Sequence, residues 1–78
     1  MKFEIAKKYI NDDGTKSFII KLAKSDLVFF GYILESFEGW GNYTTISNFK
    51  EIVLRVDVSP SYISQYEELF LFLKNYEI

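Results

Sequence analysis

Apolar and polar residues alternate in several short segments of this chain, which is the pattern of a β-strand with one buried face. The alternation is clearest in residues 51–58, EIVLRVDV. Residues 2–10 and 16–23 flank the loop Asn-Asp-Asp-Gly-Thr, in which Gly14 can adopt a positive φ, so we expect a β-hairpin there. A further strand is expected over residues 40–47. Alternate residues of the hairpin's second strand should face the core: Phe18, Ile20 and Leu22.

Helical spacing replaces alternation in residues 25–37. Apolar residues recur every three or four positions, Ser25 precedes them as an N-cap, and Gly39 follows as a C-terminal signal. A buried strand is the competing interpretation, because Leu-Val-Phe-Phe favours strands and Gly31 weakens a helix by about 1 kcal/mol. The length of the segment and its cap favour the helix. Its core face then holds Leu27, Phe30, Gly31, Leu34 and Phe37.

A second helix is expected over residues 60–76. Ser59 is suited to its N-cap and Pro60 to its first helical position. Residues at helical spacing form an apolar stripe that we expect to be mainly core: Tyr62, Tyr66, Leu69, Leu73 and Tyr76. Leu71 falls on the opposite, polar side.

The order of these elements, β-β-α-β-β-α, predicts a single α+β domain over residues 1–78. A right-handed crossover places the strand of residues 51–58 between those of 16–23 and 40–47, and the hairpin adds residues 2–10 outside. The expected fold is a two-layer ferredoxin-like sandwich with the antiparallel sheet order 1-2-4-3 and both helices on one face. The face of the sheet without helices should carry Ile19, Lys21, Ala23, Tyr43, Thr45, Val53, Arg55 and Asp57. This set has too few aromatic and basic residues for an RNA-binding platform.

The β-α-β-β-α stretch of residues 18–76 resembles the small regulatory modules called ACT domains. The junction ILESFEGWGNY also resembles a family of short uncharacterised bacterial proteins, in which the helix ends in a comparable Glu-x-aromatic-acidic-Gly run. The resemblance implies an ACT-like fold. ACT domains bind amino acids near a glycine-containing loop after their first strand. This chain has Lys24, Ser25 and Asp26 there and no glycine, so amino-acid binding is not implied.

Charge balance and missing residue types narrow the possible functions. Nine Lys and Arg against eleven Asp and Glu give a net charge of −2, and no basic run exceeds Lys7-Lys8, which argues against nucleic-acid binding. With no cysteine and no histidine, disulfides and thiolate or imidazole metal sites are excluded, and we expect no cofactor. Charges from Lys2 to Lys8 interrupt the N-terminal apolar residues, so we expect no signal peptide, no membrane span and a cytoplasmic location.

Acid-base chemistry in this chain would depend mainly on carboxylates. The pairs Asp12-Asp13 and Glu67-Glu68 are best explained as a solvated loop and a solvated helix face. Glu35 and Glu38 lie three positions apart at the end of the first helix, beside Trp40. These three residues are candidates for the border of a ligand site, and the two glutamates for an acid-base pair.

The first helix is apolar on both sides. Val28, Phe29 and Tyr32, joined by Ser36, fall opposite its core face, where a two-layer domain has only water. A chain this short buries only about 60% of its unfolded surface, so association with a partner would stabilise it. We therefore expect a non-enzymatic interaction or regulatory module that forms a homodimer, or binds another protein, through these residues and that has a small-ligand site at the interface. The alternative is a carboxylate-dependent or metal-assisted enzyme with its site between subunits.

Overall fold

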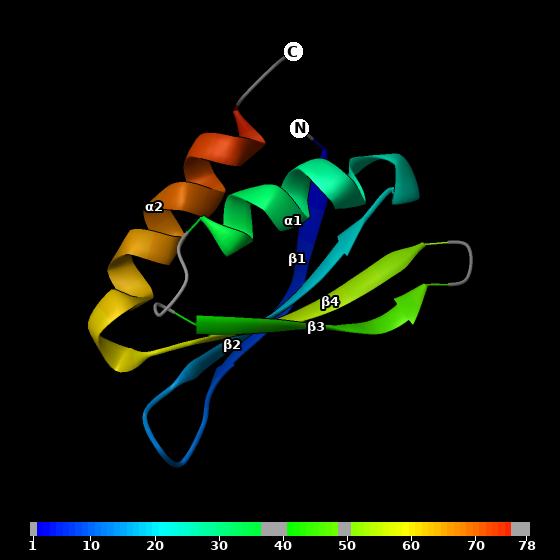
Figure 1. The fold of residues 1–78 in the computed structure, drawn as a ribbon. Coiled ribbons are helices and arrows are strands. Elements are labelled where there is room, and N and C mark those ends of the chain that lie inside the picture. Colours follow the sequence, from blue (N-terminus) through cyan, green and yellow to red (C-terminus); the bar gives the residue numbers. More distant parts are fainter. Residues whose placement is uncertain (1, 37–40, 49–50, 76–78) are drawn as a thin grey trace.

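The computed structural model describes residues 2–36, 41–48 and 51–75 of the chain, and it has the predicted element order (Figure 1). The fold class is confirmed: an α+β domain of the ferredoxin-like type. The strands are β1 (Phe3–Ile10), β2 (Lys16–Leu22), β3 (Gly41–Asn48) and β4 (Ile52–Val58). The helices are α1 (Leu27–Glu35) and α2 (Ile63–Lys74), preceded by the 3-10 turns η1 (Lys24–Asp26) and η2 (Pro60–Tyr62).

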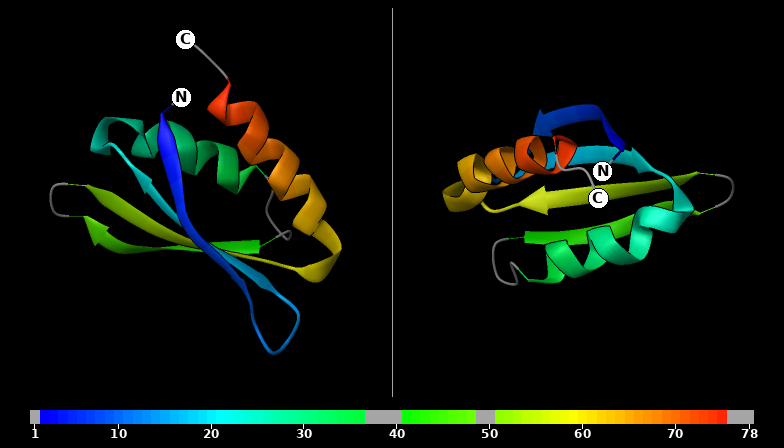
Figure 2. Two further views of the ribbon diagram at one scale, coloured as in Figure 1. Left: turned by 180° about the vertical axis from the view of Figure 1, so that it is seen from behind. Right: turned by 90° about the horizontal axis from the view of Figure 1, so that it is seen from above.

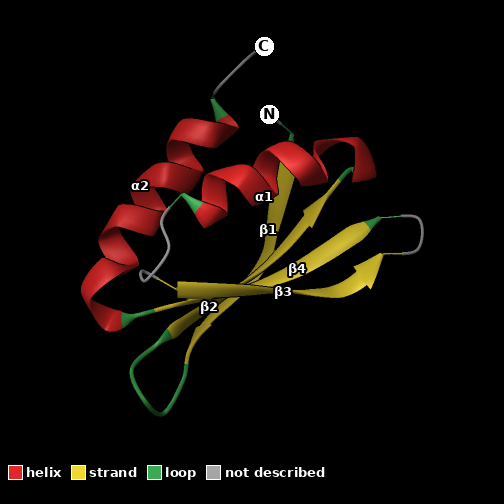
Figure 3. Cartoon of the chain, in the orientation of Figure 1, coloured by secondary structure: helices red, strands yellow, loops and turns green. Residues whose placement is uncertain are grey.

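The four strands form one sheet in the predicted order β1-β2-β4-β3, with every neighbouring pair antiparallel (Figure 3). Phe18 of β2 is paired with Val56 of β4, so apolar residues of the two central strands lie side by side on one face. Each edge strand has one register shift, between Ile5 and Lys7 in β1 and between Thr45 and Ser47 in β3. A bulge of this kind bends a strand locally and is common at sheet edges.

The turn of the predicted hairpin depends on Gly14. Its φ is +88°, a conformation that residues with a Cβ rarely adopt. A Cβ at this position would also lie 3.3 Å from Cγ of Pro60, the first residue of η2. The turn is closed by backbone bonds in both directions between Asn11 and the segment that follows, from Gly14 N–H to the Asn11 carbonyl (2.9 Å) and from Asn11 N–H to the Thr15 carbonyl (2.8 Å).

The core lies between one face of the sheet and the two helices, and Phe70 of α2 is at its centre. The Phe70 ring packs edge-on against Phe18 with ring centroids 5.1 Å apart, and it stacks on Phe30 of α1 at 6.3 Å. Phe3 and Tyr66 complete the cluster. The core residues from the strands are Phe18, Ile20, Leu22, Ile52, Leu54, Val56 and Val58, and those from the helices are Phe30, Leu34, Tyr66, Phe70 and Leu73.

The two helices lie above the same side of the sheet in Figure 1 but over different strands. Seen from above, α1 runs along the β3 side and α2 lies towards the β1 and β2 side (Figure 2). None of the helices within the described ranges is long and apolar enough to cross a membrane.

The predicted N-cap of the first helix is wrong. Ser25 lies inside η1, and the α-helix begins only at Leu27, after Asp26, which makes no capping hydrogen bond with its side chain. The cause is the 3-10 turn, whose first hydrogen bond runs from Asp26 N–H to the Ala23 carbonyl at 3.0 Å. Ser59 and Pro60 do begin the second helical segment, although Ser59 makes no side-chain cap.

Two residues predicted for the open face of the sheet are on the helix face instead. Tyr43 is paired with Val56 and Thr45 with Leu54, and both partners are core residues. Because paired residues in an antiparallel sheet point to the same side, Tyr43 and Thr45 point towards α1. Ala23, also predicted for the open face, follows the end of β2 and belongs to no strand.

Candidate functional site

The side of α1 that faces away from the sheet carries large apolar side chains. Val28 and Tyr32 are each 67% exposed and Phe29 is 39% exposed, whereas Phe30 on the opposite side is completely buried. This arrangement follows from the 100° turn between successive helical residues, which puts neighbours in sequence on different faces. For the described residues, the predicted division of α1 into a core face and an outer face is therefore what the structure has, and Phe37, also predicted for the core face, lies outside them.

The outer face of α1 also has very little charge. The helix LVFFGYILE contains one charged residue, Glu35, in its last position. Ser36, the fourth residue predicted for this face, is exposed, and its hydroxyl donates to the backbone carbonyl of Tyr32 at 2.8 Å. Clustered exposed apolar residues of this kind are typical of interaction sites, whereas single ones are ordinary on protein surfaces. We refer to Val28, Phe29, Tyr32 and Ser36 as the α1 outer face.

A groove of about 280 Å³ separates α1 from β3. Its lining residues are Leu27, Val28, Gly31, Tyr32, Glu35, Tyr43 and Thr45, so it adjoins the α1 outer face. The Tyr43 hydroxyl donates to Oε1 of Glu35 at 3.1 Å, and a Cβ on Gly31 would lie 3.3 Å from the same hydroxyl. Gly31 thus makes room for Tyr43, which explains a glycine in the middle of this helix. Desolvation, helped by the bond to Glu35, raises the pKa of Tyr43, so the hydroxyl remains a donor.

Of the three residues predicted to border a ligand site, only Glu35 can be placed. It is exposed and lies at the rim of the groove, with Tyr43 as its hydrogen-bond partner. Glu38 and Trp40 lie outside the described residues. Among the residues that are described, no group of three or more carboxylate, histidine or cysteine side chains is arranged to hold a metal ion.

One carboxylate of each of the other two pairs has a structural partner. Asp13 accepts hydrogen bonds from the backbone N–H and the hydroxyl of Thr15, at 3.0 and 2.6 Å, and these bonds lower the pKa of Asp13. Glu67 of α2 accepts a bond from the Lys16 ammonium of β2 at 2.5 Å, which lowers the pKa of Glu67. These contacts tie the hairpin together and attach α2 to the sheet.

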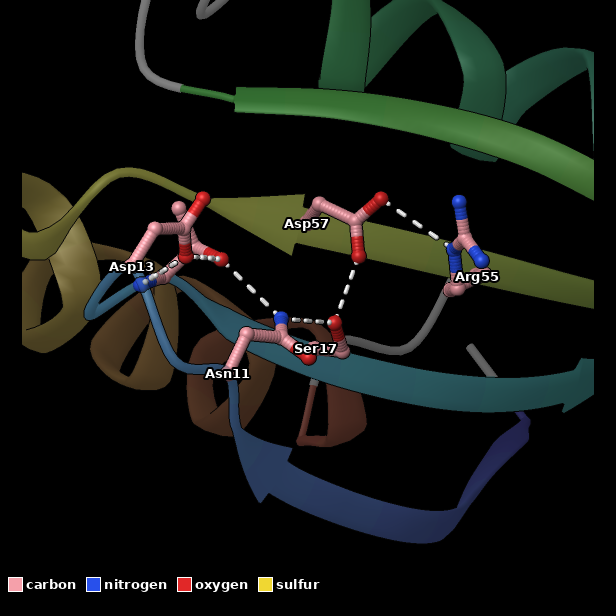
Figure 4. A network of polar contacts seen from close by, with 6 residues as sticks. Asn11, Asp13, Ser17, Arg55 and Asp57 are labelled. Carbon is pink, nitrogen blue, oxygen red and sulfur yellow. Dashed lines mark hydrogen bonds and ion pairs between the residues drawn. The ribbon is translucent and has the colours of Figure 1, made fainter.

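A polar network that the sequence does not reveal links the hairpin to β4 (Figure 4). The Asn11 amide donates to the hydroxyl of Ser17 at 2.8 Å, and that hydroxyl donates to Asp57 at 2.5 Å. The other Asp57 oxygen accepts from Arg55 Nε at 3.1 Å. The network borders a polar hollow of about 380 Å³ at the hairpin end of the sheet. Since these groups satisfy one another, we assign the network to stability rather than to ligand binding.

A second groove, of about 530 Å³, lies between α2 and β1. Its floor includes Ile5, Phe18 and Phe70, and its rim has charges of both signs, including Lys8 and Lys74 as well as Glu67 and Glu68. Leu71 borders it and is 64% exposed, as its predicted place on the polar side of the helix requires. Phe72, which the sequence analysis did not single out, is 62% exposed.

Comparison of the chain with protein-family models, with curated proteins and with solved structures finds no match. The ACT-like resemblance therefore stays a prediction. The surfaces described above are therefore the basis for proposing a function.

Proposed function

We propose that this protein is a non-enzymatic interaction module that acts as a homodimer, with the α1 outer face at the centre of the contact. The observation that supports this proposal best is the pair of large apolar side chains, Val28 and Tyr32, that are two-thirds exposed on one helix. Burial of apolar side chains contributes about 25 cal/mol per Å² removed from water. A domain of this size gains more from such burial than a larger one, because its own core is small.

A second copy of the chain suits this surface. A twofold axis brings one patch against itself, so any charge near the axis meets a like charge. The α1 outer face has no charged member, and the nearest charge on α1 is Glu35, at the end of the helix and bonded to Tyr43. Self-association of this face thus has no electrostatic penalty at its centre. Another protein with an apolar, uncharged surface is the alternative partner.

A small-ligand site at the border of this interface remains part of the proposal. Glu35 and Tyr43 supply polar groups at the rim of the groove that adjoins the α1 outer face, and Glu38 and Trp40 follow in sequence. The ACT-like resemblance is in keeping with a regulatory role. The resemblance to short bacterial proteins favours a bacterial source, and we propose a cytoplasmic location.

An enzyme whose site is shared between subunits is less well supported. Glu35, the candidate acid or base that can be placed, is exposed and already accepts a hydrogen bond from Tyr43. An acid-base carboxylate needs a pKa matched to its task, and burial or a like charge is the usual cause of such a shift. Glu35 is exposed at the rim of the groove, so its carboxylate is neither buried nor shielded from water.

Light scattering combined with size-exclusion chromatography tests the proposal directly. The wild-type chain should have the mass of two chains at high micromolar concentration. Phe29→Glu should have the mass of one chain and keep its circular dichroism spectrum, since Phe29 lies outside the core cluster. Leu71→Glu, at an exposed position on α2, is the matched control and should remain a dimer. A wild-type chain that is monomeric at all concentrations would overturn the homodimer, and loss of the Phe29→Glu fold would place Phe29 in the core.

A further inference from the structure

We infer that this protein has a second interaction surface, at which the outer edge of β3 accepts an extended peptide segment of another protein as an additional strand. β3 is the last strand of the sheet, and no described segment pairs with its outer side. Alternate backbone N–H and C=O groups of an edge strand point outwards and can bond a further strand. At eight residues, β3 is longer than the usual strand of about 5–6 residues, so it offers a long template.

The sequence of β3 lacks two of the features that protect an edge from pairing, charged residues and proline. GNYTTISN has no charged residue and no proline, although one bulge lies between Thr45 and Ser47. The opposite edge strand, β1, has Glu4, Lys7 and Lys8 in its eight residues. Charged side chains on an edge disfavour pairing with another chain, so β3 is the edge at which a strand can be added.

The groove between α1 and β3 would receive side chains of the added strand. Tyr43 and Thr45 point to the helix side of the sheet, and every second residue of a neighbouring strand would point to the same side. Those residues would enter the groove beneath α1, whose other walls include Val28 and Tyr32. At about 280 Å³ the groove has room for one or two side chains of the added strand.

The charges around the groove determine which peptide fits. Glu35 is the one charged residue among those that line it, and the other lining residues are apolar or carry hydroxyl groups, apart from Gly31. A lysine or arginine of the peptide, placed next to apolar residues, would be opposite the Glu35 carboxylate. This carboxylate accepts one bond from Tyr43 and has further acceptor positions. The partner is therefore an extended, mainly apolar segment with a basic residue.

A second copy of this chain does not fit the β3 edge as well as a peptide does. Antiparallel pairing of two β3 edges across a twofold axis would put both α1 helices on the same side of the joined sheet, next to the junction. The space above the outer side of β3 is already taken by α1, which runs along that side of the sheet (Figure 2). A peptide segment has no helix layer of its own and avoids this overlap. The inference needs no homodimer, since its polar binding groups are the β3 backbone and Glu35. The groove shares Val28 and Tyr32 with the α1 outer face, however, so a dimer formed through that face would compete with the peptide.

Binding of synthetic peptides tests this surface. The probe is a fluorescein-labelled, capped octapeptide of alternating threonine and valine in which one valine is replaced by lysine, measured by fluorescence anisotropy against the full chain. We expect a dissociation constant below about 1 mM, and binding about tenfold weaker for the peptide with glutamate in place of lysine. Glu35→Gln should remove the difference between the two peptides. Glu68→Gln, an exposed carboxylate on α2, is the control and should preserve it.

Backbone pairing is tested with two further peptides, each N-methylated at one alternate set of amides. One set faces β3 and the other faces solvent, so one peptide should lose binding and the other should retain it. Equal binding by both methylated peptides, or no binding by the lysine peptide, would overturn strand addition. Repeating the titration with Phe29→Glu separates this result from dimerisation, because the peptide should bind the monomeric variant at least as tightly as it binds the wild-type chain. The mass measurement decides the homodimer whatever the peptide result.

Discussion

The two flanks of the molecule differ in how many charged residues they have. We call α2 with β1 the α2 flank and α1 with β3 the α1 flank (Figure 2). On the α2 flank, two lysines (Lys8 and Lys74) and two glutamates (Glu67 and Glu68) line the same groove, and Glu67 is bonded to Lys16 of the sheet. On the α1 flank, the helix has Glu35 as its one charged residue and the strand has none.

This difference separates two kinds of exposed apolar side chain. Leu71 on the α2 flank is as exposed as Val28 on the α1 flank, at 64% and 67%. Leu71, however, lies among charges of both signs that retain water and resist close approach of another surface. Val28 has apolar residues and an uncharged strand beside it. Exposure alone therefore does not identify an interaction surface, and the absence of charge around the apolar residues is the more informative feature.

The largest loss of stability is expected for a substitution in the core, where the two flanks meet. Phe70→Ala should lower the free energy of unfolding by about 3–5 kcal/mol, because the ring contacts both β2 and α1 and its removal leaves a cavity. Phe72→Ala, at a position 62% exposed, should cost much less. Urea unfolding followed by tryptophan fluorescence or circular dichroism measures both. Equal losses would mean that the outer side of α2 is also buried, in an interface.

A smaller effect is expected on the free energy of self-association, and it should differ between variants of the two flanks. Tyr32→Ala on the α1 flank should weaken self-association by about 2 kcal/mol, or roughly thirtyfold in the dissociation constant, as is common for an aromatic residue at an interface centre. Leu71→Ala on the α2 flank should leave the dissociation constant unchanged. Analytical ultracentrifugation over a concentration series measures both variants. A thirtyfold loss with Leu71→Ala instead would transfer the interface to the α2 flank.

The sequence was sufficient for the elements whose pattern is local. Alternation predicts β2 and β4, and helical spacing predicts α1 and α2, because each depends on residues a few positions apart. The same local geometry assigns Val28, Phe29 and Tyr32 to the outside of α1, where the structure has them. A right-handed crossover then leaves few sheet orders to choose from, and the predicted one is correct.

Predictions that depend on register or on a neighbouring element failed. In β3 the residues Asn-Tyr-Thr-Thr do not alternate in polarity, so its facing is set by pairing with β4, and Tyr43 was assigned to the wrong side. Phe70 was not recognised as core because Leu69 satisfies the same helical spacing, and only the packing of Phe3, Phe18 and Phe30 distinguishes the two. The link from Ser17 to Asp57 joins residues 40 positions apart and has no sequence signal.

The smallest effect expected concerns the charges that distinguish the α2 flank. The hydrogen bond from Lys16 lowers the pKa of Glu67 in the folded chain below the ordinary value of about 4.3. A group with a lowered folded-state pKa stabilises the fold above its unfolded pKa, and this contribution is lost as the pH falls through the folded value. Because the Glu67 side chain is 46% exposed, water and salt screen the pair, and we expect about 0.2–1 kcal/mol at neutral pH.

Glu67→Gln should accordingly destabilise the chain at pH 7. This deficit should disappear as the pH falls through the lowered pKa of Glu67, because the wild-type carboxylate then becomes protonated as well. The difference between the two proteins should also shrink at pH 7 in 1 M salt, where the Debye length falls to about 3 Å. Glu68→Gln, the neighbouring glutamate, for which the structure describes no ion pair, should track the wild type at every pH. Urea midpoints measured at each pH give the comparison. If Glu67→Gln keeps a constant deficit at every acidic pH at which the chain remains folded, then Glu67 stabilises α2 through packing and not through its charge, and the electrostatic distinction between the flanks rests on their exposed charges alone.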